Sequence, residues 1–276
     1  MSETGILSRD CPAKVNLFLE VLSRRPDGYH EIHTVLQTVG LYDTISGRAV
    51  PERGVHLNVV GADLPTDGGN LVYRAAERFL AETGTDGGVA LRLDKRIPVQ
   101  AGLGGGSSDA AGTLLLLRDL LAPDLPDAAL TAWAADLGSD VPFFLQGGTA
   151  RATGRGETIE PLPPAPPRWL VLFRPAFGLS TPAVYGRVEV PRDPRDGAAG
   201  AIFNRLEAAA AALDPRVASF RETVAAGLAR DEVPVLSGSG SVFFVLVANA
   251  TRAGELAAAF NRREDGAHAF AVRTVP

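Results

Sequence analysis

The chain has 276 residues and a single cysteine, Cys11. One cysteine excludes an internal disulfide framework and is typical of proteins from a reducing compartment. Neither Cys11 nor any of the four histidines stands at the spacing of zinc ligands. Because 46% of the residues are hydrophobic, the chain is long enough to bury its own core, as one large domain or two smaller ones.

Long apolar segments and a surplus of basic residues are also absent. The apolar runs, such as 114–117 and the longest one at 242–248, are far shorter than the roughly 20 residues that a membrane helix needs. The first ten residues contain no apolar stretch of a targeting signal. With 27 basic and 32 acidic residues the net charge is -5, which argues against a broad electrostatic grip on nucleic acid. We therefore expect a soluble cytoplasmic protein whose partners include neither a membrane nor a nucleic acid.

Lysine is almost missing as well. Of the 27 basic residues 25 are arginine, and only Lys14 and Lys95 are lysine. A lysine in such a background indicates either chance or a position that needs a compact ammonium instead of a planar guanidinium. The sequence leaves both interpretations open.

The hydrophobic pattern predicts a mixture of strands and helices. Strands are expected at 15–21, 29–44, 89–93, 169–174, 242–247 and 270–275. Helices are expected at 70–82, 110–121, 130–137, 206–213, 217–228 and 256–260, with a further helix starting at 139–142. Five prolines between 161 and 167 predict a stiff connector. The order of elements indicates an α+β fold in two halves, 1–160 and 168–276.

The most informative feature is a glycine-rich stretch, 98–108, that leads into a predicted helix. Glycines let backbone N–H groups approach an anion closely, and a helix that begins at Ser107 or Ser108 turns its positive end toward the stretch. A tightly packed turn without a ligand would also be rich in glycine. Four glycines in five positions, followed by two serines, favour a phosphate site.

Two familiar nucleotide-binding loops do not match this stretch. A P-loop needs a lysine before its last Ser or Thr, and no lysine stands here. A dinucleotide-binding loop would need a glycine in place of Ser107 and usually belongs to the first strand–helix unit. Ser107 and Ser139 also lack an evident histidine partner for a hydrolase triad.

Two charged residues are candidates for chemistry at a phosphoryl group. Lys14 begins a predicted strand near Asn16, and Asp140 directly precedes the helix that starts with Val141 and Pro142. Taken singly, Lys14 is best interpreted as a solvated lysine at a strand end, and Asp140 as a helix N-cap. Together they would supply a cation for a transferring phosphoryl group and a general base for an attacking alcohol.

Two pairs of residues are candidates for recognising an aromatic ligand. Tyr29 and His30 follow a turn at 27–28, so they form either an exposed hairpin tip or a platform for a base or sugar. Thr181 and Tyr185 lie beyond the proline-rich connector, where a place in the core of the second half is the favoured interpretation.

Six motifs occur in order along nearly the whole chain. They are PAKVNL at 12–17, RPDGYHE at 25–31, AGLGGGSSDAA at 101–111, LGSDVPFF at 137–144, GGTA with GRGE at 147–157, and SGSGS at 237–241. The glycine stretch and SGSGS resemble the GHMP small-molecule kinases in general. The second and fourth motifs resemble one family among them, the 4-diphosphocytidyl-2-C-methyl-D-erythritol kinases of the methylerythritol phosphate route to isoprenoid precursors.

The resemblance implies the two-domain GHMP kinase fold. Its N-terminal nucleotide-binding domain is ribosomal-protein-S5-like, and its C-terminal domain is a ferredoxin-like α/β sandwich. It implies an ATP-dependent kinase whose partner is a small molecule, phosphorylated on its 2-hydroxyl. The ATP-binding domain would be 1–160 and the substrate-side domain 168–276.

The resemblance also assigns roles toward ATP and Mg²⁺. The residues expected to hold the triphosphate are Pro98, Val99, Gln100, Ala101, Gly102, Leu103, Gly104, Gly105, Gly106, Ser107 and Ser108. Lys14 and Asp140 would flank the substrate hydroxyl, with Asp140 as the base. A serine of the loop, Ser107 or Ser108, is a candidate Mg²⁺ ligand, and no acidic ligand is singled out.

Five further residues would bind the substrate by the same resemblance. Tyr29 and Tyr185 would sandwich the cytosine, and His30 would recognise its edge. Asn16 and Thr181 would support the methylerythritol and the diphosphate. Two alternatives stay open: another GHMP kinase, acting on homoserine, mevalonate or a sugar, and a nucleotide-binding regulator without catalysis. The sequence does not indicate an oligomeric state.

Overall fold

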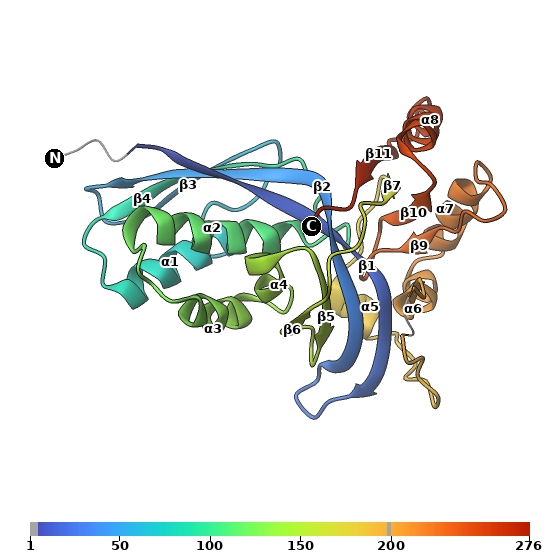
Figure 1. Ribbon diagram of the computed structural model, residues 1–276, viewed down its shortest axis with the longest axis horizontal. Helices are drawn as coiled ribbons and strands as arrows, with labels where there is room; N and C mark the ends of the chain where they lie inside the picture. The colour runs from blue at the N-terminus through green and yellow to red at the C-terminus, as the bar shows by residue number, and fades with distance from the viewer. Residues whose placement is uncertain (1–4, 198–199) are drawn as a thin grey trace. The chain divides into compact units, whose positions relative to one another are not determined.

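The computed structural model describes residues 5–197 and 200–276, which fall into two compact units (Figure 1). Unit 1 comprises the chain up to Ala13 with Leu41–Ile97 and Gly104–Gln146, and unit 2 comprises Lys14–Gly40, Pro98–Leu103 and Gly147–Pro276. The units are interleaved in sequence, whereas the expected division at the proline-rich connector is consecutive. The assignment of ATP binding to 1–160 and of substrate binding to 168–276 stays a prediction.

Two long strands contribute residues to both units. They are β1 (Leu7–Arg24) and β2 (His30–Val50). In unit 1, the end of β2 pairs antiparallel with β4 (Gly88–Asp94), so that Thr44 lies opposite Asp94. β4 in turn pairs in parallel with β3 (Gly54–Val60). Unit 1 therefore has a small mixed sheet.

Four helices complete unit 1, and Figure 1 shows them on one face of these strands. They are α1 (Leu71–Thr83), α2 (Gly105–Leu121), α3 (Asp127–Leu137) and α4 (Val141–Gln146). α1 begins where predicted, because the side chain of Asn70 accepts the N–H of Val72 and caps the helix. α2 begins at Gly105, earlier than its predicted start at Ser107 or Ser108, because Gly104 adopts a left-handed backbone and serves as the N-cap.

Unit 2 has short strands beside β1 and β2. β5 (Thr149–Thr153) pairs antiparallel with β2 and with β6 (Thr158–Pro161), and β8 (Phe203–Asn204) pairs in parallel with β1. The alternating pattern of the sequence did not predict these three strands. Strands of five, four and two residues carry too little periodic signal to be separated from loops.

A second sheet of unit 2 is entirely antiparallel, in the order β11-β7-β10-β9. Its strands are β7 (Trp169–Arg174), β9 (Val235–Leu236), β10 (Phe243–Val247) and β11 (His268–Arg273). The helices of unit 2 are α5 (Thr181–Tyr185), α6 (Leu206–Leu213), α7 (Arg216–Ala225) and α8 (Ala250–Phe260). α8 starts six residues before its predicted position, because the side chain of Asn249 caps it by accepting the N–H of Arg252.

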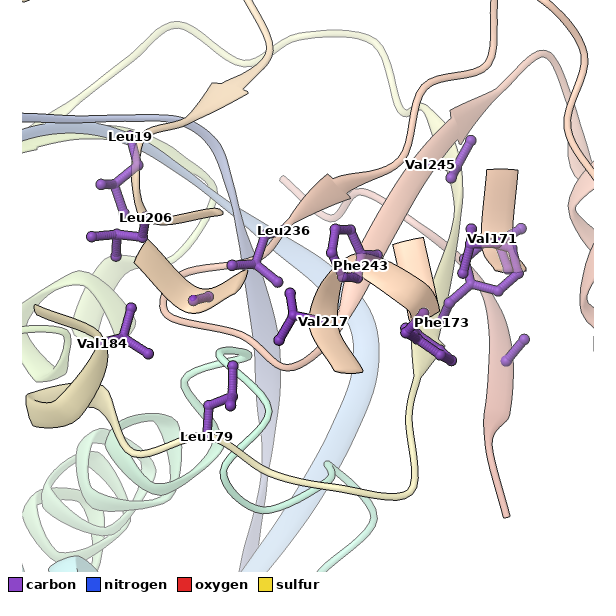
Figure 2. Packing of buried hydrophobic residues seen from close by; sticks show 14 of the residues in the cluster. Leu19, Val171, Phe173, Leu179, Val184, Leu206, Val217, Leu236, Phe243 and Val245 are labelled. Atoms are coloured by element: carbon purple, nitrogen blue, oxygen red, sulfur yellow. The ribbon is translucent and has the colours of Figure 1, made fainter. Parts of the chain in front are cut away.

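The core of unit 2 lies between the antiparallel sheet and helices α5 to α8 (Figure 2). Phe173 and Phe243 from neighbouring strands belong to this core, and both are buried. Phe173 meets Phe260 of α8 edge-to-face, with ring centroids 4.9 Å apart. Among the described residues, no helix is long and apolar enough to cross a membrane.

Candidate active site

Lys14 is the first residue of unit 2 and is only 3% exposed. Its ammonium donates to Oδ1 of Asn16 at 2.7 Å, and Nδ2 of Asn16 donates to the hydroxyl of Thr34 at 2.8 Å. The Thr34 hydroxyl donates to the carbonyl of Phe18 at 2.6 Å. The interpretation of Lys14 as a solvated lysine at a strand end is therefore wrong. Asn16 and Lys14 face the same side because they are two residues apart on a strand.

The first part of the glycine-rich stretch is fixed within unit 2. The backbone N–H of Lys14 donates to the carbonyl of Leu103 at 2.9 Å, and the hydroxyl of Ser237 donates to the carbonyl of Gly102 at 3.0 Å. Gly102 has a φ of +75°, and a side chain there would collide with the backbone oxygen of Ser237. The SGSGS motif thus packs directly on residues 98–103, although the two segments are far apart in sequence.

The second part of the stretch forms the start of α2 in unit 1. No side chain caps this helix, so its first amide groups are available to an anion. Ser108 is buried, and within the described residues its hydroxyl has no hydrogen-bond partner. Asp140 also belongs to unit 1 and directly precedes α4, as predicted.

The second lysine of the chain is buried too, in unit 1. The ammonium of Lys95 donates to Asp43 at 2.5 Å and to Asp109 at 2.7 Å, and both carboxylates are almost completely buried. Burial by itself would lower the pKa of Lys95, but the carboxylates of Asp109 and Asp43 raise it above its usual value. Burial raises the pKa of Asp109; Lys95 opposes this shift and Asp43 adds to it.

In the sequence Lys95 stands out only as a rare residue, and no motif predicts a role for Asp43 or Asp109. The scarcity of lysine was the available signal, because both lysines of the chain occupy buried polar positions. Their burial favours the interpretation that these positions use a compact ammonium over the interpretation of chance.

The predicted ring-binding residues come together in unit 2. The rings of His30 and Tyr185 have centroids 5.4 Å apart. Burial, and then the charge of Arg24, lower the pKa of His30, which keeps its ring neutral near pH 7. Tyr29 is 53% exposed, and the guanidinium of Arg155 lies 5.0 Å from the centroid of its ring.

The remaining substrate candidate, Thr181, is the first residue of α5. Its hydroxyl lies 2.7 Å from that of Ser239 in the SGSGS motif. Tyr185 packs against the hydrophobic core of unit 2. The interpretation of Tyr185 as a core aromatic residue of the second half is therefore correct.

Seven of the predicted site features belong to unit 2, and the others belong to unit 1. Unit 2 contains Lys14, Asn16, Tyr29, His30, Thr181, Tyr185 and residues 98–103. Unit 1 contains residues 104–108 and Asp140. That Lys14 and Asp140 flank one hydroxyl stays a prediction. No cluster of three or more His, Cys, Asp or Glu side chains suited to a metal occurs among residues 5–197 and 200–276.

Comparisons with known proteins agree with the resemblance seen in the motifs. Residues 70–148 match the family described as "GHMP kinases N terminal domain". The chain is 41% identical, over 269 residues, to 4-diphosphocytidyl-2-C-methyl-D-erythritol kinase of Pelotomaculum thermopropionicum, which covers 92% of this chain and 93% of the relative. Its identity with the enzyme of the same name from Deinococcus radiodurans is 42% over 270 residues, covering 92% and 89%.

Solved structures give the same result. A crystal structure of 4-(cytidine 5'-diphospho)-2C-methyl-D-erythritol kinase matches with a TM-score of 0.83 and 38% identity, covering 98% of this chain and all of the other. Homoserine kinase from Cytophaga hutchinsonii matches with a TM-score of 0.73 at 18% identity, covering 100% and 95%, a likeness that concerns the fold alone. These matches confirm the fold class predicted from the motifs.

Proposed function

Because the chain belongs to the 4-diphosphocytidyl-2-C-methyl-D-erythritol kinases, a family of GHMP kinases, we propose that the residues described above bind ATP and this cytidine diphosphate alcohol. The enzyme is an ATP-dependent phosphotransferase with an alcohol acceptor. It phosphorylates the 2-hydroxyl of 4-diphosphocytidyl-2-C-methyl-D-erythritol in the formation of isoprenoid precursors. The net charge of -5 supports a protein that does not act on nucleic acid, and the single cysteine supports a cytoplasmic location.

The glycine-rich stretch, 98–108, is proposed to hold the triphosphate of ATP. The uncapped amide groups at the start of α2 suit an anion, and Gly102 lets the SGSGS motif pack closely on the first part of the stretch. Magnesium neutralises charge on the transferring phosphates when it is bound with ATP. The buried, unpartnered hydroxyl of Ser108 would fit a protein ligand for that ion.

Lys14 and Asp140 are proposed to act on the acceptor alcohol. Asp140 accepts the proton of the 2-hydroxyl as the hydroxyl attacks phosphorus. Lys14 stabilises the negative charge that develops during transfer. The bond from Lys14 to Asn16 orients the ammonium for this role. Such catalysis consists mostly of positioning and electrostatics.

The pairing of His30 with Tyr185 is the observation that carries the choice of a cytidine substrate. These residues are far apart in sequence, yet their ring centroids lie 5.4 Å apart, and Tyr29, the residue before His30, is exposed. A neutral imidazole offers one donor and one acceptor nitrogen, which suits the edge of a cytosine. Homoserine, mevalonate or a sugar contains no aromatic ring that these side chains could bind.

The deciding experiment is a coupled ADP-release assay with ATP, Mg²⁺ and a panel of alcohols. The panel contains 4-diphosphocytidyl-2-C-methyl-D-erythritol, methylerythritol 4-phosphate without the cytidine, homoserine and mevalonate. We expect turnover with the first compound alone and inhibition of that turnover by CMP. Phosphorus NMR of the product should place the new phosphate on the 2-hydroxyl.

Two results would contradict the proposal. Turnover of homoserine or mevalonate that is indifferent to CMP would assign the chain to another GHMP activity. Binding of ATP without ADP release for any alcohol would favour a nucleotide-binding regulator.

A further inference from the structure

A buried cluster of three charged side chains joins the two ends of the glycine-rich stretch. Its members are Asp43 on β2, Lys95 directly after β4, and Asp109 in the first part of α2. The exposed fractions of their side chains are 0%, 4% and 2%, and all three belong to unit 1. A buried charge is costly unless it is paired, so this arrangement calls for a physical reason.

Asp43 holds the entry to the stretch. Its Oδ1 accepts the backbone N–H of Arg96 at 2.5 Å and that of Ile97 at 2.8 Å. Ile97 is the residue directly before Pro98, where the stretch begins. One carboxylate oxygen therefore fixes the direction in which the chain enters the stretch.

Lys95 links the N-terminal end of the stretch, next to Ile97, to its C-terminal end at the start of α2. Its ammonium donates to the other oxygen of Asp43 and to Oδ2 of Asp109. A side-chain carbon at Gly105, the first residue of α2, would lie 3.2 Å from this ammonium. The first turn of α2 thus packs directly on the Lys95 ammonium and is held there by Asp109.

We propose that Asp43, Lys95 and Asp109 are positioning residues that set the separation and direction of the two ends of the phosphate-binding stretch. The proposal deepens the proposed function and rests on its placement of the ATP phosphates at residues 98–108. Fixing both ends removes most of the conformations that a free loop would sample. The backbone N–H groups are then ordered before ATP arrives, which lowers the entropy cost of binding.

Stability alone does not account for the cluster. Replacing a buried ion pair or triad by apolar residues of similar size is often neutral or stabilising in proteins. A cluster kept only for stability would therefore be replaceable without a functional effect. A cluster kept for positioning would lose ATP affinity in the same replacement.

The experiment compares a neutral triple variant, Asp43→Asn with Lys95→Met and Asp109→Leu, with the single variant Asp109→Asn. The triple variant keeps an oxygen at position 43 for the N–H groups of the entry but breaks the link to α2. We expect its Kd for ATP to rise tenfold or more and that of Asp109→Asn about threefold. Hydrogen exchange of the amides in 96–108 should accelerate in both, while Kd for the cytidine substrate changes less than twofold.

Leu130→Ala is the matched control, because Leu130 is a buried residue of α3 in the same unit. It should lower Tm without changing Kd for ATP or exchange in 96–108. Unchanged ATP affinity in the folded triple variant would overturn the proposal. If the triple variant does not fold, unchanged affinity and exchange in Asp109→Asn would do so. ATP binding needs no acceptor alcohol, so a wrong acceptor in the proposed function would appear in the turnover assay and not here.

Discussion

The ammonium of Lys14 donates a 2.7 Å hydrogen bond to the amide oxygen of Asn16, and both side chains are buried in unit 2. Asn16 is itself oriented by Thr34, whose hydroxyl passes the chain of hydrogen bonds on to the carbonyl of Phe18. A lysine with four rotatable bonds is thereby held in one direction. The catalytic role proposed for Lys14 depends on that direction.

Replacing Thr34 by valine tests this chain of hydrogen bonds. Thr34→Val keeps the shape of the side chain but leaves the amide of Asn16 without its acceptor, which costs about 1–3 kcal/mol for a buried polar group. We expect a lower Tm and a several-fold lower kcat. Thr34→Ser, which keeps the hydroxyl, should retain most of the activity. Equal kcat values for the two variants would show that the Thr34 hydroxyl does not help to position Lys14.

Asp140→Asn tests the proposed general base. The amide is nearly isosteric with the carboxylate but cannot accept the proton of the 2-hydroxyl, so we expect kcat to fall on the order of a hundredfold or more. Tm should stay close to that of the parent protein. Asp136→Asn is the control, because Asp136 lies four residues earlier on an exposed face of α3. Full activity of Asp140→Asn would remove Asp140 from the mechanism.

Gly102→Ala tests the close approach of the glycine-rich stretch to the SGSGS motif. The new methyl group would collide with the carbonyl of Ser237, and the positive φ is unfavourable for alanine. We expect a lower Tm and a KM for ATP raised at least tenfold. Gly254→Ala is the control, because Gly254 lies in α8 with open space around it and should gain slightly in stability. Similar ATP kinetics for both variants would contradict this account of Gly102.

Glu20 predicts a pH dependence of stability in unit 2. Burial by itself would raise its pKa, but the guanidinium of Arg205 and the backbone N–H groups of Arg195 and Val21 lower it below its usual value of 4.5. The folded state thus binds this proton less tightly than the unfolded state. The contribution of Glu20 to the free energy of unfolding is therefore complete above about pH 4.5 and is lost as the pH falls below it.

Denaturation of the parent protein and of Glu20→Gln at pH 7 and at pH 3.5 measures this contribution. The gap in the free energy of unfolding should narrow at the lower pH. The variant Glu264→Gln, at an exposed position, should show the same small difference at both values. A gap that stays constant with pH would show that Glu20 does not couple folding to this proton.

Much of the secondary structure could be predicted from hydrophobic periodicity. The helices at 70–82, 130–137 and 206–213 and the strands at 89–93 and 169–174 agree with α1, α3, α6, β4 and β7 to within a few residues. Short strands such as β5 and β6 gave no usable pattern. The predicted start of α2, at Ser107 or Ser108, was two or three residues too late. Gly104 serves as the N-cap through its left-handed backbone, and the sequence contains no capping side chain that would indicate this position.

The residues of the candidate site could be predicted only in part, and not from hydrophobic periodicity. Each residue taken singly allowed more than one interpretation. The interpretation of Lys14 as a solvated lysine was wrong, because its position at the end of a predicted strand does not determine whether it is exposed to water. The scarcity of lysine was the better guide, since both lysines are buried among polar partners. The link from Lys95 to Asp43 and Asp109 joins three segments that are distant in sequence, so no local pattern contains it.

The sequence by itself determined the element types, the glycine-rich stretch and the ordered motifs, because these depend on residue properties and short-range spacing. Tertiary structure alone decided which carboxylates surround Lys95, which ring lies beside His30, and which turn packs on Gly102. The physical reason is that burial and pairing depend on segments brought together by folding. The chemistry of a buried lysine is therefore set by its neighbours in space and not by its neighbours in the chain.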